Sequence, residues 1–266
     1  MAIRHFALLM ACFFMSACHT TSHRQDFQAP TNSLVVNAQF KHLTFFQEGK
    51  GERLHVYIEG DGRPFLNRFL IAKDPSPQNP LMLNLMMQDK SSSFYLGRPC
   101  YFTNSTPAMQ DTQCTPTFWT SARYSEAVVN SMIAALRQHL STHPHQGISL
   151  IGHSGGGTLA VLMAARMPEV DQVVTLAGNL DIVAWARLHR YTPLKYSLNP
   201  ADLNLLHIKQ LHFGGEKDDN IPPALSAAWL KSMEQAMHII KDADHNCCWL
   251  MHWNHVLTQI NQQMTP

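Results

Sequence analysis

Short apolar runs alternate with longer segments of helical periodicity, a pattern that predicts strands alternating with helices. Residues 32–47 alternate between apolar and polar positions, so we expect two antiparallel edge strands there. The apolar runs expected to form buried strands are 54–58, 93–96, 148–151, 173–177, 207–213 and 237–240. The segments expected to form helices are 81–87, 123–139, 158–166, 222–235 and 248–262.

Buried strands that alternate with helices predict an α/β fold, with a mostly parallel central sheet and helices on both faces. Ligand sites in such sheets form where the strands end. The segment 180–204 lies between two predicted strands and is the candidate for a small lid or insertion. The following residues come directly after predicted strands, and we expect them to meet at one edge: Gly60, Arg98, Ser154, Asn179, Asp218 and His245.

Length and composition favour one globular domain, which we expect to span residues 33–266. The chain has 266 residues, of which 45% are hydrophobic. Charged residues make up 15%, below the roughly 25% typical of soluble domains. The formal net charge is +1 and there is no long basic run, which argues against a nucleic-acid partner. The composition does not predict an oligomeric state.

The N-terminus has the pattern of an export signal. The basic Arg4 precedes an apolar run, 6–15, that is too short to span a bilayer but fits a signal peptide. Small residues before Cys18 resemble the lipobox of bacterial lipoproteins, so we expect cleavage of residues 1–17 and lipidation of Cys18. Residues 18–32 would then form a tether. The expected location is the bacterial envelope, on the outer membrane facing the periplasm; the alternative is plain secretion with cleavage near Ala17.

Export changes what the cysteines are expected to do, because disulfides persist in an oxidising compartment. We favour a Cys100–Cys114 disulfide that closes a short loop, with two buried free thiols as the alternative. Cys247 and Cys248 are adjacent. A bond between neighbouring cysteines is expected to be strained, so free thiols are predicted there.

The segment Gly152-His153-Ser154-Gly155-Gly156 lies between a predicted strand and a predicted helix. Strand, G-x-S-x-G and helix, in that order, form a nucleophile elbow. The turn is so tight that only small residues fit two positions before and after the serine. Ser154 is therefore the candidate nucleophile, and the alternative is a chance Gly-Ser-Gly turn.

A serine nucleophile needs a base and a carboxylate that orients the base, and the expected chain order is Ser, Asp or Glu, His. The loop after the strand 207–213 places the acid at Asp218, with Asp219 as the alternative. His245 follows the last predicted strand and is the candidate base. The alternative for His245 is a surface histidine in a polar loop.

The oxyanion of an acyl-transfer intermediate needs backbone donors. We expect the amide of Gly155 and, from the loop after the strand 54–58, the amide of Asp61, with Gly62 as a near alternative. Glu59 and Asp61 are acidic, and a carboxylate beside a developing oxyanion would oppose catalysis unless it is paired or points away. The candidate partners for these carboxylates are Arg63, Arg98 and Arg123.

From Leu54 to the final helix, these motifs resemble the α/β-hydrolase superfamily. The loop 214–222 resembles the turn that holds the acid in many of its members. More narrowly, the chain is similar to a group of bacterial α/β-hydrolase lipoproteins, whose resemblance implies envelope location and hydrolase chemistry without a defined substrate. The segments that carry the narrower resemblance are 57–62, 98–100, 154–157 and 178–181.

These observations predict a serine hydrolase that uses no cofactor or metal and acts on a small-molecule or lipid ester. A carboxylesterase for short acyl groups is favoured over a long-chain lipase, because no long apolar lid is evident. The alternatives are an acyltransferase or peptidase with the same triad, or a non-catalytic envelope binding protein. Asn179 and Asp181 either line the pocket or cap a helix. The histidine pairs His143/His145 and His252/His255 lack a third metal ligand.

Overall fold

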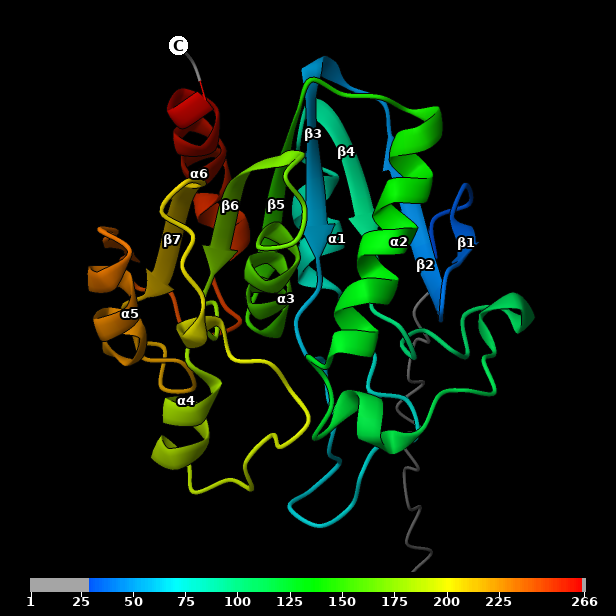
Figure 1. Cartoon of the computed structure of the whole chain (residues 1–266), viewed down its shortest axis with the longest axis horizontal. Helices are drawn as coiled ribbons and strands as arrows, with labels where there is room; N and C mark the ends of the chain where they lie inside the picture. The colour runs from blue at the N-terminus through cyan, green and yellow to red at the C-terminus, as the bar shows by residue number, and fades with distance from the viewer. Residues whose placement is uncertain (1–28, 265–266) are drawn as a thin grey trace, which may run out of the picture.

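A mixed β-sheet organises the computed structural model, which describes residues 29–264 (Figure 1). The strand order is β1-β2-β4-β3-β5-β6-β7-β8. The pairs β1/β2 and β2/β4 are antiparallel and the other neighbours are parallel. The bounds are β1 (Leu34–Asn37), β2 (Lys41–Gln47), β3 (Lys50–Ile58), β4 (Ser91–Leu96), β5 (Gly147–His153), β6 (Val170–Leu176), β7 (Lys209–Gly215) and β8 (Met237–Ile240).

Helices cover both faces of this sheet, as the sequence pattern predicts. Helices α2, α3 and α5 pack in one apolar cluster, and α1 and α6 pack in the other. The bounds are α1 (Leu81–Met86), α2 (Glu126–Thr142), α3 (Gly155–Ala164), α4 (Ile182–Leu188), α5 (Ala227–Ser232) and α6 (Trp249–Met264). Short 3-10 helices lie at Pro107–Met109, Pro116–Trp119, Pro200–Asp202 and Pro223–Ser226.

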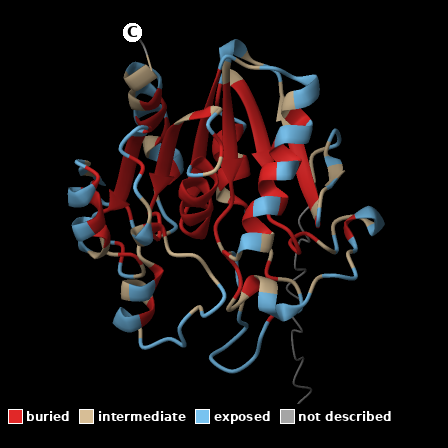
Figure 2. Ribbon diagram, in the orientation of Figure 1, coloured by how far each residue is buried: buried red, intermediate tan, exposed pale blue. Residues whose placement is uncertain are grey.

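The alternation of side chains along the central strands divides the core between the two faces. In β3, Leu54, Val56 and Ile58 belong to the cluster under α2 and α3, whereas Tyr57 belongs to the cluster under α1 and α6. Every residue of β5 and of α3 is buried. The buried strands and α3 form the centre of the molecule, and exposed loops extend from the end where the parallel strands stop (Figure 2). The nucleophile candidate therefore stands at the junction of the two most deeply buried elements.

One predicted helix differs from the structure. The helix expected over 222–235 is divided into the 3-10 helix Pro223–Ser226 and the short α5, which is followed by Glu234 with a φ of 54°. This left-handed residue reverses the chain, and Gln235 N–H bonds back to the Leu230 carbonyl. The segment 180–204 contains α4 and the 3-10 helix Pro200–Asp202.

The N-terminal predictions lie outside the described residues: the signal peptide 1–17, the lipidation site Cys18 and most of the tether. Among residues 29–264, no helix combines the length and the hydrophobicity needed to cross a bilayer.

The structure contains two disulfides among the described residues. Cys100 and Cys114 are joined, with a Cα–Cα distance of 5.4 Å, and close the loop as favoured. Cys247 and Cys248 are also joined, so the expectation of free thiols is wrong. Cys248 has a φ of 80°, a left-handed conformation that the sequence pattern does not predict.

His42 ties β2 to two neighbouring segments from inside the core. Its Nδ1 donates to the Gly97 carbonyl at 2.8 Å, and its Nε2 lies 2.8 Å from Ser131 Oγ on α2. Ser131 Oγ in turn accepts from the Phe40 amide. Burial lowers the pKa of His42 to about 4, so the imidazole is neutral in the folded protein at neutral pH.

We therefore expect the free energy of unfolding to fall as the pH drops from 6.5 toward 4. The unfolded imidazole, with its ordinary pKa, binds a proton that the folded one resists, an effect on the order of 3 kcal/mol. The variant His42→Gln keeps one donor and one acceptor but cannot titrate, so its stability should vary less over this range. The exposed His207 provides the control His207→Gln. Urea denaturation across this pH range measures the slopes, and equal slopes for wild type and His42→Gln would contradict the prediction.

Candidate active site

Ser154 stands at the sharp turn between β5 and α3, with φ 52° and ψ −120°. Two glycines make this turn sterically feasible. A Cβ on Gly152 would lie 2.2 Å from the Gly156 carbonyl oxygen, and one on Gly156 would lie 2.2 Å from the Ile58 carbonyl oxygen. The backbone of the elbow thus packs directly against the end of β3. This is the geometry that the G-x-S-x-G pattern predicts.

Ser154, His245 and Asp218 form a continuous hydrogen-bonded chain. His245 Nε2 lies 3.0 Å from Ser154 Oγ, and His245 Nδ1 lies 2.9 Å from Asp218 Oδ2. Because Nδ1 faces a carboxylate, it carries the proton, and Nε2 is left to accept one from the serine. The structure therefore brings together the three residues that the sequence suggested, from the ends of β5, β7 and β8.

The choice between the two neighbouring aspartates follows from their surroundings. The Asp218 carboxylate is buried, and its Oδ1 accepts from the amides of Asn220 at 2.9 Å and Ile221 at 2.8 Å. These two donors leave Oδ2 directed at His245. Asp219 is exposed. The geometry favours Asp218 over Asp219 as the acid.

A second histidine, His153, holds the loop that carries His245. Its Nε2 donates to the His245 carbonyl at 2.7 Å, and Trp249 Nε1 donates to the same oxygen at 3.2 Å. Burial, together with the neighbouring His245, lowers the pKa of His153 to about 4. In the sequence, His153 is only the variable residue of the G-x-S-x-G motif, and no pattern there indicates its contact with His245.

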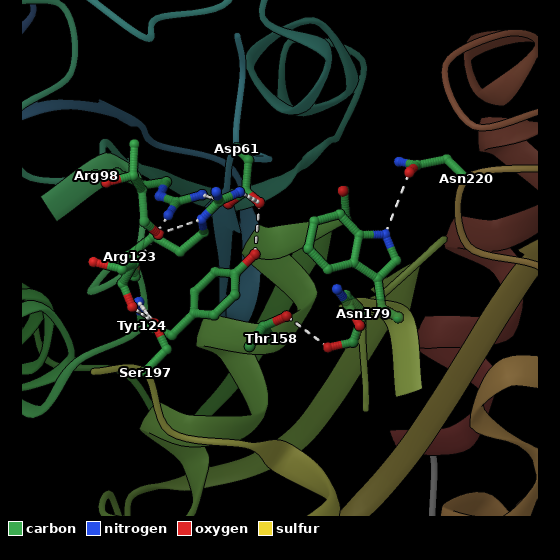
Figure 3. Close-up of polar contacts among 12 residues, drawn as sticks. Asp61, Arg98, Arg123, Tyr124, Thr158, Asn179, Ser197 and Asn220 are labelled. Carbon is green, nitrogen blue, oxygen red and sulfur yellow. Dashed lines mark hydrogen bonds and ion pairs between the residues drawn. The ribbon is translucent and has the colours of Figure 1, made fainter. Parts of the chain in front are cut away.

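The Asp61 carboxylate lies in a buried cluster of cations and phenols (Figure 3). Its Oδ1 is 2.5 Å from Arg98 Nη1, and its Oδ2 accepts from Arg123 Nη1 at 2.8 Å and the Tyr124 hydroxyl at 2.6 Å. Burial opposes ionisation, but Arg123, Arg98 and Tyr124 together hold the pKa of Asp61 well below its ordinary value. Of the three candidate partners, Arg63 is excluded because its guanidinium donates to the Leu66 carbonyl instead.

This cluster also fixes Asp61 against the elbow. A Cβ on Gly155 would lie 2.1 Å from Asp61 Oδ1, so the carboxylate packs on the glycine. Gly60 also lies against the elbow, since a Cβ there would be 3.4 Å from Ser154 Cβ. Within the part of the chain that the structure describes, the amides of Asp61 and Gly155 donate to no other residue. Both predicted oxyanion donors therefore lie near Ser154 with their N–H groups free to donate.

The other acidic residue of the loop, Glu59, contacts backbone and a phenol instead of an arginine. Its Oε2 accepts from the Met82 amide at 3.1 Å and from the Tyr95 hydroxyl at 3.3 Å. Burial raises the pKa of Glu59 to about 7. Helix α1 begins after Pro80, which provides no side-chain cap, and Glu59, the residue after β3, accepts from an amide of its first turn. Glu59 therefore orders the wall of the site.

The two residues after β6 have different roles. Asn179 lines the pocket, and its carbonyl accepts from Thr158 Oγ1 at 2.6 Å (Figure 3). Asp181 caps α4, because its Oδ1 accepts from the Val183 and Ala184 amides. The sequence left open whether these residues line the pocket or cap a helix; Asn179 does the first and Asp181 does the second.

A pocket of about 1250 Å³ opens above the triad. Ser154 and His245 lie in its floor. One wall comes from the loop that follows β3, including Phe65 and Leu66, and the opposite wall from α4 and the segment after it, including Trp185 and Tyr191. The segment expected as a lid therefore forms a wall of the pocket.

Comparison with known proteins identifies the fold. Residues 92–184 match the family model described as lipase (class 3), a stretch that contains Ser154. An esterase from Pyrococcus furiosus is similar in structure, with a TM-score of 0.62 and 10% identity over 88% of this chain and 90% of that one. An α/β serine hydrolase homologue from Coxiella burnetii has a TM-score of 0.56 and 10% identity over 90% of this chain and 100% of that one. No curated protein sequence matches this chain.

A further similar structure is XC6422 from Xanthomonas campestris, an α/β serine hydrolase without a lid. Its TM-score is 0.55, with 12% identity over 91% of this chain and 100% of that one. These similarities confirm the prediction of an α/β-hydrolase fold. The match to the lipase (class 3) model supports a serine hydrolase.

Because its partners are buried, we expect Asp61 to contribute much more to the free energy of unfolding than an aspartate in a partly exposed ion pair. Asp61→Asn leaves two buried guanidiniums without a counter-charge and should lower the free energy of unfolding by about 3 kcal/mol or more. The control is Asp171→Asn, which breaks a bidentate pair with Arg53 that is partly exposed and should cost less than about 1 kcal/mol. Urea denaturation at pH 7 compares the two. Equal losses in the two variants would refute the ranking.

Proposed function

We propose that this chain, a member of the α/β-hydrolase superfamily, is a serine hydrolase that cleaves carboxylic esters through an acyl enzyme on Ser154. The observation that carries the proposal is the hydrogen-bonded chain from Ser154 Oγ through His245 to Asp218, with spacings of 3.0 and 2.9 Å. These distances are within the reach that proton transfer requires. A complete chain of this kind argues against a purely binding role, which has no need of an activated serine.

In the proposed reaction, His245 Nε2 takes the proton of Ser154 as Oγ attacks the ester carbonyl. Asp218 stabilises the resulting imidazolium through Nδ1. The tetrahedral intermediate collapses when its C–O bond to the alcohol breaks, and the alcohol leaves with the proton from His245. A water molecule then gives a proton to His245 and attacks the acyl carbon. The second collapse releases the acid and returns the proton to Ser154.

The surroundings of the oxyanion support this role. The amides of Gly155 and Asp61 are proposed to donate to the negative oxygen, and Gly155 is the first residue of α3, where the helix dipole favours negative charge. The Asp61 carboxylate is paired with the guanidiniums of Arg98 and Arg123, so the three side chains together carry a net positive charge. This pairing supports the proposal, because the negative charge of Asp61 is balanced beside the developing oxyanion.

Substitution of the nucleophile tests the proposal. A fluorophosphonate probe should label the wild type and fail to label Ser154→Ala, because only an activated serine reacts with it. Hydrolysis of p-nitrophenyl esters should fall by at least about 10⁴-fold in the same variant. The exposed Ser141 supplies the control Ser141→Ala, which should behave as wild type. Full turnover by Ser154→Ala would contradict the assignment of Ser154 as the nucleophile. Transfer of the acyl group mainly to an added alcohol would identify an acyltransferase instead.

We also propose that the protein is anchored in the bacterial envelope through a lipid on Cys18. The support is the sequence pattern alone: an apolar run, small residues and a cysteine. The mass of the mature N-terminal peptide should show cleavage before Cys18 and an added lipid. Cys18→Ala should abolish the added lipid. An unmodified Cys18 in the purified protein would overturn the location.

A further inference from the structure

The loop after β3 carries a small hairpin whose tip is apolar and exposed. Phe65 bridges Ile71, and the Leu66 amide donates to the Leu70 carbonyl at 2.8 Å. Asn67 Oδ1 accepts from the amides of Phe69 and Leu70, each at 2.9 Å. The tip is thus held by its own backbone. Phe69 is 91% exposed and Leu70 is 53% exposed.

A second apolar segment faces the pocket from the other side. It runs from α4 to residue 196, and four of its large side chains are at least half exposed. The exposed set is Val183, Leu188, Tyr191 and Tyr196. The rings of Trp185, His189 and Tyr191 pack together, with centroids 5.2 to 5.8 Å apart, and hold the shape of the segment: His189 stacks on Tyr191, and Trp185 meets both edge-on.

Residues 63–73 and 182–198 together form what we call the rim of the pocket. Both segments line the cavity above Ser154. In Figure 1 they extend from the end of the molecule where the parallel strands stop, and Figure 2 shows both as largely exposed. Exposed apolar groups gathered at the mouth of a pocket commonly mark an interaction surface.

The charges of the rim are all of one sign. Neither segment contains an aspartate or glutamate, and the whole chain has a net charge of only +1. The flanking acids are engaged locally: Asp74 accepts from Thr103 Oγ1, and Asp181 caps α4. The rim carries six exposed cations: Arg63, Arg68, Lys73, Arg187, Arg190 and Lys195.

We propose that the rim docks on an anionic lipid bilayer and presents the pocket to esters held in that bilayer. Projecting apolar tips can enter the interface while the cations between them meet anionic head groups. Phe69 and Leu70 are the inserted side chains, since they are exposed and do not line the pocket. The docking follows from the rim itself. That docking brings the pocket to membrane-held esters is a consequence that rests on the proposed function.

Vesicle flotation tests the docking directly. The full chain with Ser154→Ala and Cys18→Ser, which removes hydrolysis and the predicted anchor, should bind vesicles of phosphatidylglycerol and phosphatidylcholine. It should bind vesicles of phosphatidylcholine alone at least ~10-fold less, because each cation near an anionic surface strengthens binding by roughly 5-fold. Phe69→Ser/Leu70→Ser should lower binding to the anionic vesicles at least ~10-fold, since two inserted apolar side chains are lost. Arg68→Glu should lower it by at least ~5-fold.

Matched controls lie at the opposite end of the sheet. Leu206, 51% exposed, precedes β7, and the exposed Lys50 begins β3. Leu206→Ser and Lys50→Glu should leave vesicle binding unchanged. Equal losses in the rim and control variants would overturn the proposal, and so would equal binding to both kinds of vesicle. A rim-dependent dimer that ignores vesicles would assign the surface to a second copy of the chain.

Activity measurements separate this proposal from the esterase itself. In the Cys18→Ser chain with Ser154 intact, Phe69→Ser/Leu70→Ser should hydrolyse soluble p-nitrophenyl acetate at the wild-type rate. It should lose at least ~10-fold on an ester embedded in anionic vesicles, in step with its lost binding. Soluble activity without vesicle binding would refute the docking alone. Vesicle binding without hydrolysis of any ester would refute the proposed function alone.

Discussion

One partly buried carboxylate, that of Asp61, joins the parts of the chain that make the site. It connects the loop after β3 to Arg98 at the exit of β4 and to Arg123 and Tyr124 before α2. It also packs against Gly155 at the start of α3. A buried charge is tolerated only where opposite charges and hydrogen bonds surround it. The elbow, the oxyanion loop and the pocket wall therefore depend on this one set of contacts.

The sequence was most informative where neighbours along the chain are also neighbours in the site. Ser154 was found because the elbow is local: strand, glycines and helix are contiguous. Asp218 and His245 followed from chain order and from the rule that parallel strands end at one edge. The core was equally accessible, since apolar periodicity in β3 and β5 reports burial on both faces.

What the sequence did not predict depends on contacts between distant segments. Three arginines were plausible partners for Asp61, and only tertiary packing selects Arg98 and Arg123. The bond between Cys247 and Cys248 accompanies a left-handed residue that composition does not mark. The rim is another case, because exposure of Phe69 cannot be inferred from an apolar run.

The hydrogen bond from His153 to the His245 carbonyl also limits where a proton can go. The two rings lie 5.1 Å apart between centroids, close enough for a second imidazole to compete as a base. The Nε2 proton of His153 is committed to a carbonyl, and burial lowers the pKa of the ring to about 4, which makes its Nδ1 a weak proton acceptor. His153, the residue before the nucleophile, therefore positions the loop of His245 through this hydrogen bond and takes no part in proton transfer. Among the described residues Ser154 Oγ is hydrogen-bonded to His245 Nε2 alone, so its proton passes to that nitrogen although two histidines adjoin it.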